Sequence, residues 1–151
     1  METNRVLEII TEQRSFFKGN HTKEISFRIS MLKKLKEVIK KSEQELFDAI
    51  YADFEKSEFE TLAAELIPIY SEIDLAIKKV SAWSRVVKVS SGLANFPAKS
   101  YIIPEPLGVT LIIGAWNYPF QLSIVPAISS LAAGNTVILK PSEISSNTSA
   151  V

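Results

Sequence analysis

Two short polar clusters carry the side chains of this sequence that could bind a small molecule. The first, Trp116-Asn117-Tyr118-Pro119, offers an amide, and the second, Lys140-Pro141-Ser142-Glu143, offers an ammonium group and a carboxylate. Each cluster follows a short apolar run rich in β-branched residues, at Val109–Ile113 and at Thr136–Leu139. Parallel strands end on the same edge of a sheet, and open α/β sheets bind ligands at that edge. We therefore expect both clusters to face one crevice.

The stretch between the clusters predicts how they are brought together. Phe120 to Ala133 is mostly apolar with helical spacing, and Gly134 stands where a helix C-cap favours a residue that tolerates positive φ. A strand, a helix and a strand of these lengths predict a βαβ unit, whose crossover is almost always right-handed. Both apolar runs are typical of buried parallel strands. Pro126 should kink the helix or lie in its first turns, and should leave one backbone hydrogen bond unmade.

The residues that precede these strands predict a layer of helices. We expect helices over residues 3–17 and 24–41, one that starts at Ser42–Glu45, and a longer one from Ser57–Glu60 to Trp83. The last two begin at Ser-x-x-Glu sequences, which have the form of a capping box. Apolar steps of three and four in the longest helix resemble a heptad seam, so a coiled coil is an alternative to packing against the other helices.

The composition changes between the helical layer and the first strand. Residues 86–98 contain serine, glycine, asparagine and proline, which indicates a boundary. Ser100 to Leu107 then looks extended. Pro104 and Pro106 lack a backbone donor, which confines this stretch to the edge of a sheet.

The motifs at both clusters resemble those of a known enzyme family. Gly114 to Phe120, Gly-Ala-Trp-Asn-Tyr-Pro-Phe, resembles the signature of aldehyde dehydrogenases around their oxyanion-hole asparagine, and Lys140 to Glu143 resembles their cofactor-ribose motif. The Tyr-Pro-Phe sequence, Ala-Ala-Gly-Asn at 132–135 and Gln13 to Phe17 look most like the class 3, fatty aldehyde dehydrogenase type. The resemblance covers essentially the whole chain.

The resemblance implies a reaction and a role for each residue of the clusters. The family oxidises an aldehyde to a carboxylate through a cysteine thiohemiacetal, with hydride transfer to NAD or NADP. By this resemblance Asn117 donates its amide to the developing oxyanion, a contribution of ~3–4 kcal/mol. Lys140 and Glu143 hydrogen-bond the adenosine ribose, Trp116 lines the nicotinamide side through its backbone, and Tyr118 lines the aldehyde entrance.

The sequence departs from the family pattern in what it lacks. It contains no cysteine, and no other side chain here can replace that thiolate as the nucleophile. The family's general-base glutamate and Gly-rich turn also lie beyond residue 151. Ser145 to Thr148 looks like an N-cap cluster, but only three residues follow it. We therefore expect the leading part of such an enzyme, inactive by itself.

The expected fold class is α/β, with an N-terminal helical layer and the first βαβ unit of a Rossmann-like parallel sheet. We expect a helical segment at residues 1–85, a linker and extended edge or oligomerisation arm at 86–107, and the truncated start of an NAD(P)-binding domain at 108–151. A Gly-x-Gly-x-x-Gly motif is absent, so only the resemblance supports NAD(P).

Charge and hydropathy restrict the partners. The 17 basic and 17 acidic side chains cancel, which gives no electrostatic case for nucleic acid. The chain has no signal peptide and no run of the ~20 apolar residues that a membrane span needs, so we expect a cytoplasmic protein, with an anchor after residue 151 left open. The partners we expect are a small-molecule aldehyde and a second copy of the chain. The family resemblance implies a homodimer, in which the arm at 100–107 takes part in subunit contacts. Self-association is expected separately, because two strands alone leave an exposed sheet edge.

The remaining alternatives concern histidine and the type of reaction. His21 is the only histidine, and without an accompanying carboxylate or second histidine it indicates a solvated residue at the start of a helix, not a metal ligand or base. We expect no metal site. A non-catalytic nucleotide-binding or oligomerising module and another reaction of the same superfamily, such as acyl reduction, are the rival functions.

Overall fold

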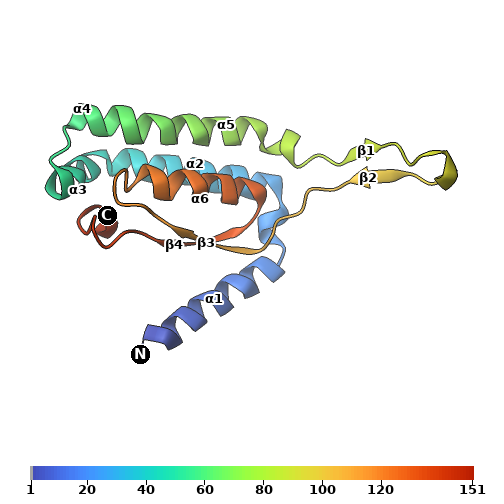
Figure 1. Cartoon of the computed structure of the whole chain (residues 1–151), viewed down its shortest axis with the longest axis horizontal. Coiled ribbons are helices and arrows are strands. Elements are labelled where there is room, and N and C mark those ends of the chain that lie inside the picture. The colour runs from blue at the N-terminus through green and yellow to red at the C-terminus, as the bar shows by residue number, and fades with distance from the viewer. Residues whose placement is uncertain (1) are drawn as a thin grey trace.

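The computed structural model describes residues 2–151 of the chain (Figure 1). Its helices are α1 (Glu2–Lys18), α2 (Ile25–Lys41), α3 (Glu43–Phe54), α4 (Glu58–Thr61), α5 (Ile67–Trp83) and α6 (Gln121–Ala133). A π-helical turn at Leu62–Leu66 joins α4 to α5, and short 3-10 helices lie at His21–Lys23, Leu93–Asn95 and Thr148–Ala150. The strands are β1 (Val87–Val89), β2 (Ser100–Ile102), β3 (Val109–Ile113) and β4 (Thr136–Lys140).

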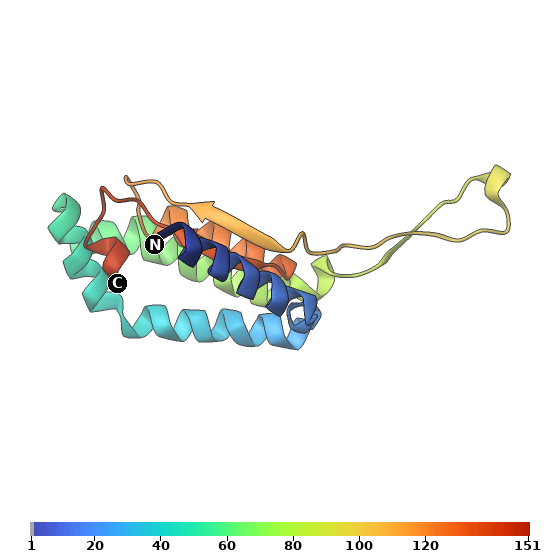
Figure 2. The ribbon, with the colours of Figure 1, turned by 90° about the horizontal axis from the view of Figure 1, so that it is seen from below.

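Strands β3 and β4 and helix α6 form the predicted βαβ unit. The two strands pair in parallel, in a register that runs from Val109 opposite Thr136 to Ile113 opposite Lys140. Helix α6 lies between this strand pair and helices α2 and α5, whereas α1 lies against the other face of the strands (Figures 1 and 2). The mixed α/β fold class is confirmed.

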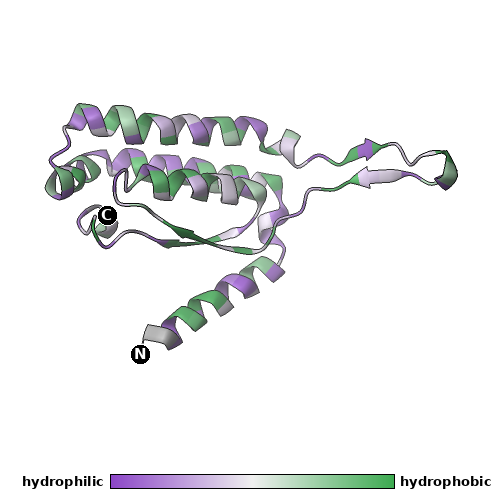
Figure 3. Ribbon diagram, viewed as in Figure 1, coloured by the Kyte–Doolittle hydropathy of each residue, from purple (hydrophilic) through white to green (hydrophobic). Residues whose placement is uncertain are grey.

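The core is formed where α2, α5 and α6 meet. Helices α2 and α5 show alternating hydrophobic and hydrophilic bands in Figure 3. The fully buried residues include Leu32 of α2, Ile69 and Ile73 of α5, and Ile128 of α6. Each contributes roughly 1.5–3 kcal/mol through removal of its side chain from water. Helix α5 thus packs against the other helices, and a coiled coil is not formed.

The serine half of the capping box predicted at Ser57 is present. The Ser57 hydroxyl accepts a hydrogen bond from the Glu60 N–H at 3.2 Å, as a capping box requires. A helix begins after Ser42 as predicted, but the capping box expected there was wrong. The Ser42 side chain makes no capping hydrogen bond to α3, and its N–H donates to the carbonyls of Val38 and Ile39 as the C-cap of α2.

The predicted long helix is interrupted by the π-helical turn before Pro68. Proline removes a helical donor, and its ring clashes with the carbonyl four residues earlier. A wider turn just before Pro68, at the start of α5, relieves that conflict. The turn also changes which residues face inward, and it contains the buried Glu65. In α6, Pro126 lies inside the helix, as expected.

The segment from residue 86 to residue 107 contains a strand that the sequence analysis did not predict. Residues 87–89 form a strand, and β1 pairs with β2 in an antiparallel two-stranded ribbon that projects away from the body of the molecule (Figures 1 and 2). The extended stretch thus forms a ribbon of its own and does not lie along the edge of the parallel strands. Phe96 and Leu93 near the tip are 85% and 96% exposed, so the ribbon presents an uncovered apolar surface.

The expectation of fully buried strands was also wrong. Leu111 and Ile113 in β3 are 61% and 69% exposed. Strand β3 has only β4 as a neighbour among the described residues, and α1 covers only part of the face opposite α6.

Candidate active site

The two polar clusters begin at the same edge of the parallel strands. The Gly114 N–H, just after β3, donates to the carbonyl of Lys140 at the end of β4 over 2.9 Å. The clusters that follow, 116–119 and 140–143, therefore leave the sheet side by side, as predicted.

The turn after β3 leaves the Asn117 amide free for a ligand. Asn117 is exposed, and among residues 2–151 its side-chain amide has no hydrogen-bond partner. The backbone of the same turn is well satisfied. The Tyr118 carbonyl accepts from the Leu122 N–H at 3.0 Å, and the Pro119 carbonyl accepts from the Ser123 hydroxyl at 2.7 Å. A fixed backbone with an unpartnered amide is what a hydrogen-bond donor to a ligand oxygen requires.

The aromatic residues flank this amide. Trp116 is 53% exposed and Tyr118 is 36% exposed. The Trp116 ring lies 6.3 Å from the ring of Phe54, and the Tyr118 ring lies 4.0 Å from the ammonium of Lys56. Both predicted site aromatics are therefore oriented by residues around the C-terminal end of α3.

The second cluster presents a charged pair to solvent. The Lys140 ammonium forms an ion pair with the Glu143 carboxylate, and both side chains are exposed. The hydrogen bond from Lys140 is the main reason that the pKa of Glu143 is lowered from its ordinary value. A donor and an ionised acceptor side by side suit two neighbouring hydroxyls, such as those of a ribose, so this pair fits a nucleotide sugar.

A buried carboxylate that the sequence analysis missed caps the N-terminus of α6. Glu65 is fully buried, and its Oε2 accepts from the N–H groups of Phe120 and Gln121 at 2.9 and 3.1 Å. These N–H groups have no partner within the helix, and the positive end of the helix dipole favours a carboxylate there. The Lys56 ammonium lies 3.3 Å from the other oxygen of Glu65 and donates to the Asn117 carbonyl over 2.6 Å.

A buried cation at the opposite end of α6 completes this arrangement. The Arg28 guanidinium donates to the carbonyl of Ala132 in the last turn of α6 at 3.2 Å. It also donates to Thr22 O at 2.7 Å, Lys23 O at 2.9 Å and Ser84 Oγ at 3.1 Å. Burial lowers the pKa of Arg28, and the nearby Glu24 carboxylate opposes that effect. The crossover helix is therefore held at both ends by charges from the N-terminal helices.

The loop after β4 is anchored by another missed residue, Asp53. Its two oxygens accept from the backbone N–H and side chain of Asn147 and from the backbone N–H and hydroxyl of Thr148, over 2.7–3.1 Å. Burial acts to raise the pKa of Asp53, but these hydrogen bonds outweigh it, so the pKa lies below its ordinary value. Asp53, Lys56 and Glu65 thus connect one short segment to both loops of the site.

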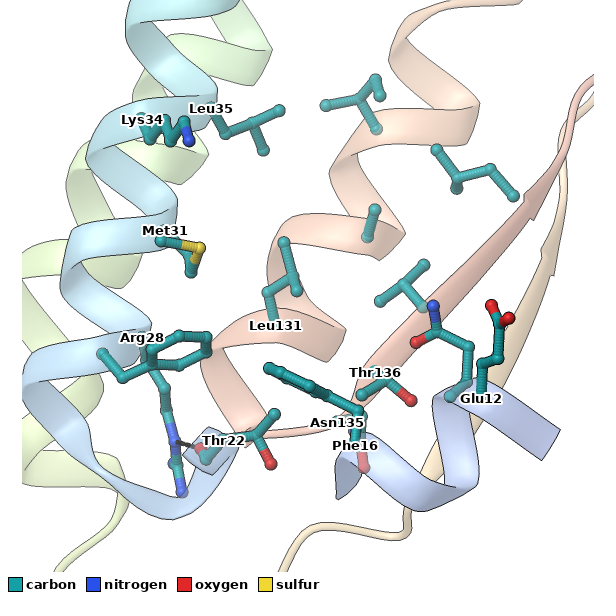
Figure 4. A pocket seen from close by; sticks show the side chains of 16 residues that line it. Glu12, Phe16, Thr22, Arg28, Met31, Lys34, Leu35, Leu131, Asn135 and Thr136 are labelled. Carbon is teal, nitrogen blue, oxygen red and sulfur yellow. Dashed lines mark hydrogen bonds between the residues drawn. The ribbon is translucent and has the colours of Figure 1, made fainter. Parts of the chain in front are cut away.

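A separate cavity of about 770 Å³ lies between α1, α2, α6 and β4 (Figure 4). Most of its lining is apolar, including Phe16, Met31 and Leu131, with Arg28 bound to Thr22 at one end. None of the predicted site residues lines it.

A model of the aldehyde dehydrogenase family matches residues 1–151. The chain belongs to this family. Among its relatives, 4,4'-diaponeurosporen-aldehyde dehydrogenase of Staphylococcus aureus is 43% identical over 140 residues, which are 93% of this chain and 30% of that protein. Aldehyde dehydrogenase family 3 member A2 of Pongo abelii is 41% identical over 142 residues, which are 94% of this chain and 29% of that protein.

A solved structure shows the same arrangement of the aldehyde dehydrogenase fold. A substrate-bound state of Staphylococcus aureus AldH matches with a TM-score of 0.93 and 41% identity, over 96% of this chain and 32% of that one. The chain spans about 30% of the length of these relatives and corresponds to the N-terminal part of their fold. The resemblance to the class 3 type is confirmed by relatives named as family 3 members.

The structure shows the predicted site residues of this aldehyde dehydrogenase chain on one sheet edge, and it adds Asp53, Lys56 and Glu65. The one available signal for Glu65 is a glutamate within an apolar helical stripe, between Leu62 and Leu66. Asp53 and Lys56 lie in an ordinary charged stretch, so no local pattern distinguishes them. Across residues 2–151, no helix combines the length and apolarity that crossing a bilayer requires.

Proposed function

We propose that these residues provide the oxyanion donor and the ribose-binding pair of an NAD(P)-dependent aldehyde dehydrogenase. The enzyme would oxidise aldehydes to carboxylates through a thiohemiacetal on a cysteine. The 151 residues contain no cysteine, so the nucleophile would come from chain outside them. The observation that carries the proposal is the exposed, unpartnered amide of Asn117 on a backbone turn that is fixed at both ends.

Asn117 would act by binding the substrate oxygen more strongly as its negative charge grows. The backbone that carries the donor is held by Lys56, so this part of the site would not have to rearrange during the reaction. Tyr118 would line the path of the aldehyde, and its ring is held over the Lys56 ammonium. Trp116 would border the nicotinamide side through its backbone.

Lys140 and Glu143 would hold the adenosine ribose of NAD or NADP. The ammonium donates and the ionised carboxylate accepts, which matches two vicinal hydroxyls. Such a dinucleotide would supply the hydride acceptor for the oxidation. The relative named aldehyde dehydrogenase, dimeric NADP-preferring, of Canis lupus familiaris, is 38% identical over 95% of this chain and 32% of that protein, which supports a nicotinamide cofactor and a homodimer. We place the protein in the cytoplasm.

A chimera tests this function directly. Residues 1–151 would replace the corresponding part of the 4,4'-diaponeurosporen-aldehyde dehydrogenase of Staphylococcus aureus, which supplies the rest of the chain. We expect the chimera to form NADH or NADPH from an aldehyde, and the 151-residue chain alone to form none. Asn117→Ala should lower kcat roughly 100- to 1000-fold. Asn4→Ala, at an exposed residue of α1, is the matched control. An inactive chimera that folds and binds nucleotide, or full activity after Asn117→Ala, would contradict the proposal.

A further inference from the structure

Lys56 and Glu65 form an ion pair beneath the turn that carries Asn117. Lys56 lies between α3 and α4, and Glu65 lies in the π-helical turn. The ammonium and carboxylate are 3.3 Å apart, and their side chains are only 13% and 0% exposed. Burial of a charged pair is unfavourable unless hydrogen bonds satisfy the remaining oxygens and protons. Here those hydrogen bonds go to the backbone around Asn117.

The pair binds this backbone at Asn117 and again at the start of α6. The Lys56 ammonium donates to the Asn117 carbonyl over 2.6 Å. Glu65 accepts from the Phe120 and Gln121 N–H groups at the start of α6. The ion pair therefore ties the carbonyl of Asn117 to the helix N-terminus three to four residues later. It fixes the position of the turn relative to α6.

The Asn117 amide depends on this anchor because its side chain has no hydrogen-bond partner of its own among residues 2–151. The backbone of Asn117 therefore sets the point from which this side chain reaches a ligand. An oxyanion donor stabilises a reaction only if it is fixed where charge develops, and small misplacements cost much of the rate. Lys56 also lies 4.0 Å from the Tyr118 ring, so it orients the next residue as well.

We propose that the Lys56–Glu65 ion pair is the positioning device of the Asn117 amide. The inference rests on the proposed function, in which that amide meets the oxyanion. Neither residue touches the substrate, and both act through the Asn117 turn. Asp53 binds the loop after β4 through Asn147 and Thr148. The short segment 53–65 therefore holds the Asn117 turn and the loop after β4 through separate contacts.

Kinetics of the chimera defined above test this role. Lys56→Met keeps the length of the side chain and removes the donor, and should lower kcat roughly 10- to 100-fold. The KM for the nucleotide should stay within about twofold of the value for the unsubstituted chimera. The reason is that Asp53, and not Lys56, holds the loop after β4 that follows Lys140. Lys56→Arg retains a charged donor and should recover part of the loss. Lys79→Met, at an exposed lysine of α5, is the matched control and should leave kcat unchanged.

A double-mutant cycle separates positioning from general structural damage. If Lys56 acts through Asn117, Lys56→Met should lower kcat less than about twofold further in an Asn117→Ala background. A full additional loss in that background would overturn the inference, as would an unchanged kcat for Lys56→Met. If the Lys56→Met variant does not fold, Glu65→Gln takes its place as the test. Glutamine keeps an acceptor for the Phe120 and Gln121 N–H groups but cannot form the ion pair. Glu65→Gln should lower kcat when residue 117 is asparagine, and should not lower it further in the Asn117→Ala background. Lack of activity before any substitution would instead contradict the proposed function.

Discussion

Gly134 is a position where both the backbone conformation and the packing oppose a single added methyl group. Its φ is +91°, in the left-handed region that L side chains rarely adopt. A Cβ atom there would lie 2.6 Å from Nη2 and 2.7 Å from Cζ of Arg28. The guanidinium cannot move aside cheaply, because four hydrogen bonds hold it against α6, the 3-10 helix and Ser84.

The expected cost of Gly134→Ala has two parts. Left-handed backbone costs an L residue roughly 1–2 kcal/mol. Forcing a methyl group into a close-packed contact costs about 1–3 kcal/mol more. Together these parts predict a loss of roughly 2–5 kcal/mol in the free energy of unfolding. In an Arg28→Ala background the steric part should vanish, so Gly134→Ala should then cost only about 1–2 kcal/mol.

Urea unfolding of the 151-residue chain measures both quantities. Fluorescence of Trp83 and Trp116 reports the transition, at protein concentrations where the midpoint does not depend on concentration. A loss of less than about 1 kcal/mol in the free energy of unfolding for Gly134→Ala would contradict both parts of the expected cost, since the left-handed backbone alone should cost more. If Gly134→Ala lowered the free energy of unfolding equally with Arg28 and in the Arg28→Ala background, the contact between the added methyl group and Arg28 would not contribute.

Three further predictions concern the site loops and the surface. Asp53→Asn should destabilise the chain by about 1–3 kcal/mol at pH 7 through loss of charge-assisted hydrogen bonds. The folded-state pKa of Asp53 lies below its ordinary value, so this stability is present above pH ~4 and disappears as the pH falls through the folded-state pKa. The urea midpoints of the parent and the Asp53→Asn variant should therefore converge only in acid. Glu143→Gln in the chimera should raise the nucleotide KM by roughly tenfold with little change in kcat, and an unchanged KM would remove Glu143 from the ribose site. The 151-residue chain should self-associate through its uncovered strands and apolar ribbon, and a monodisperse monomer by light scattering would contradict this.

Local patterns in the sequence were sufficient to predict the βαβ unit. The β-branched runs, the apolar stretch between them and Gly134 each favour the conformation that forms, and a parallel pair must end on one edge. The clusters at 116–119 and 140–143 could therefore be assigned to one side of the sheet before any coordinates. Their chemical roles came from the resemblance to a family and not from these patterns.

Long-range packing decided what holds the clusters in place. Glu65 and Arg28 act on α6 across 55 and 104 positions of sequence, and no local rule links a glutamate in one helix to the N-terminus of another. The failed capping box at Ser42 has the same cause, since only one residue separates α2 from α3 and the packing of the two helices decides the conformation of that residue. The sequence by itself determined the βαβ unit and the edge that carries the amide. Only the tertiary structure determined which buried charges fix that amide, because burial and hydrogen bonding of a charge depend on neighbours that are distant in the chain.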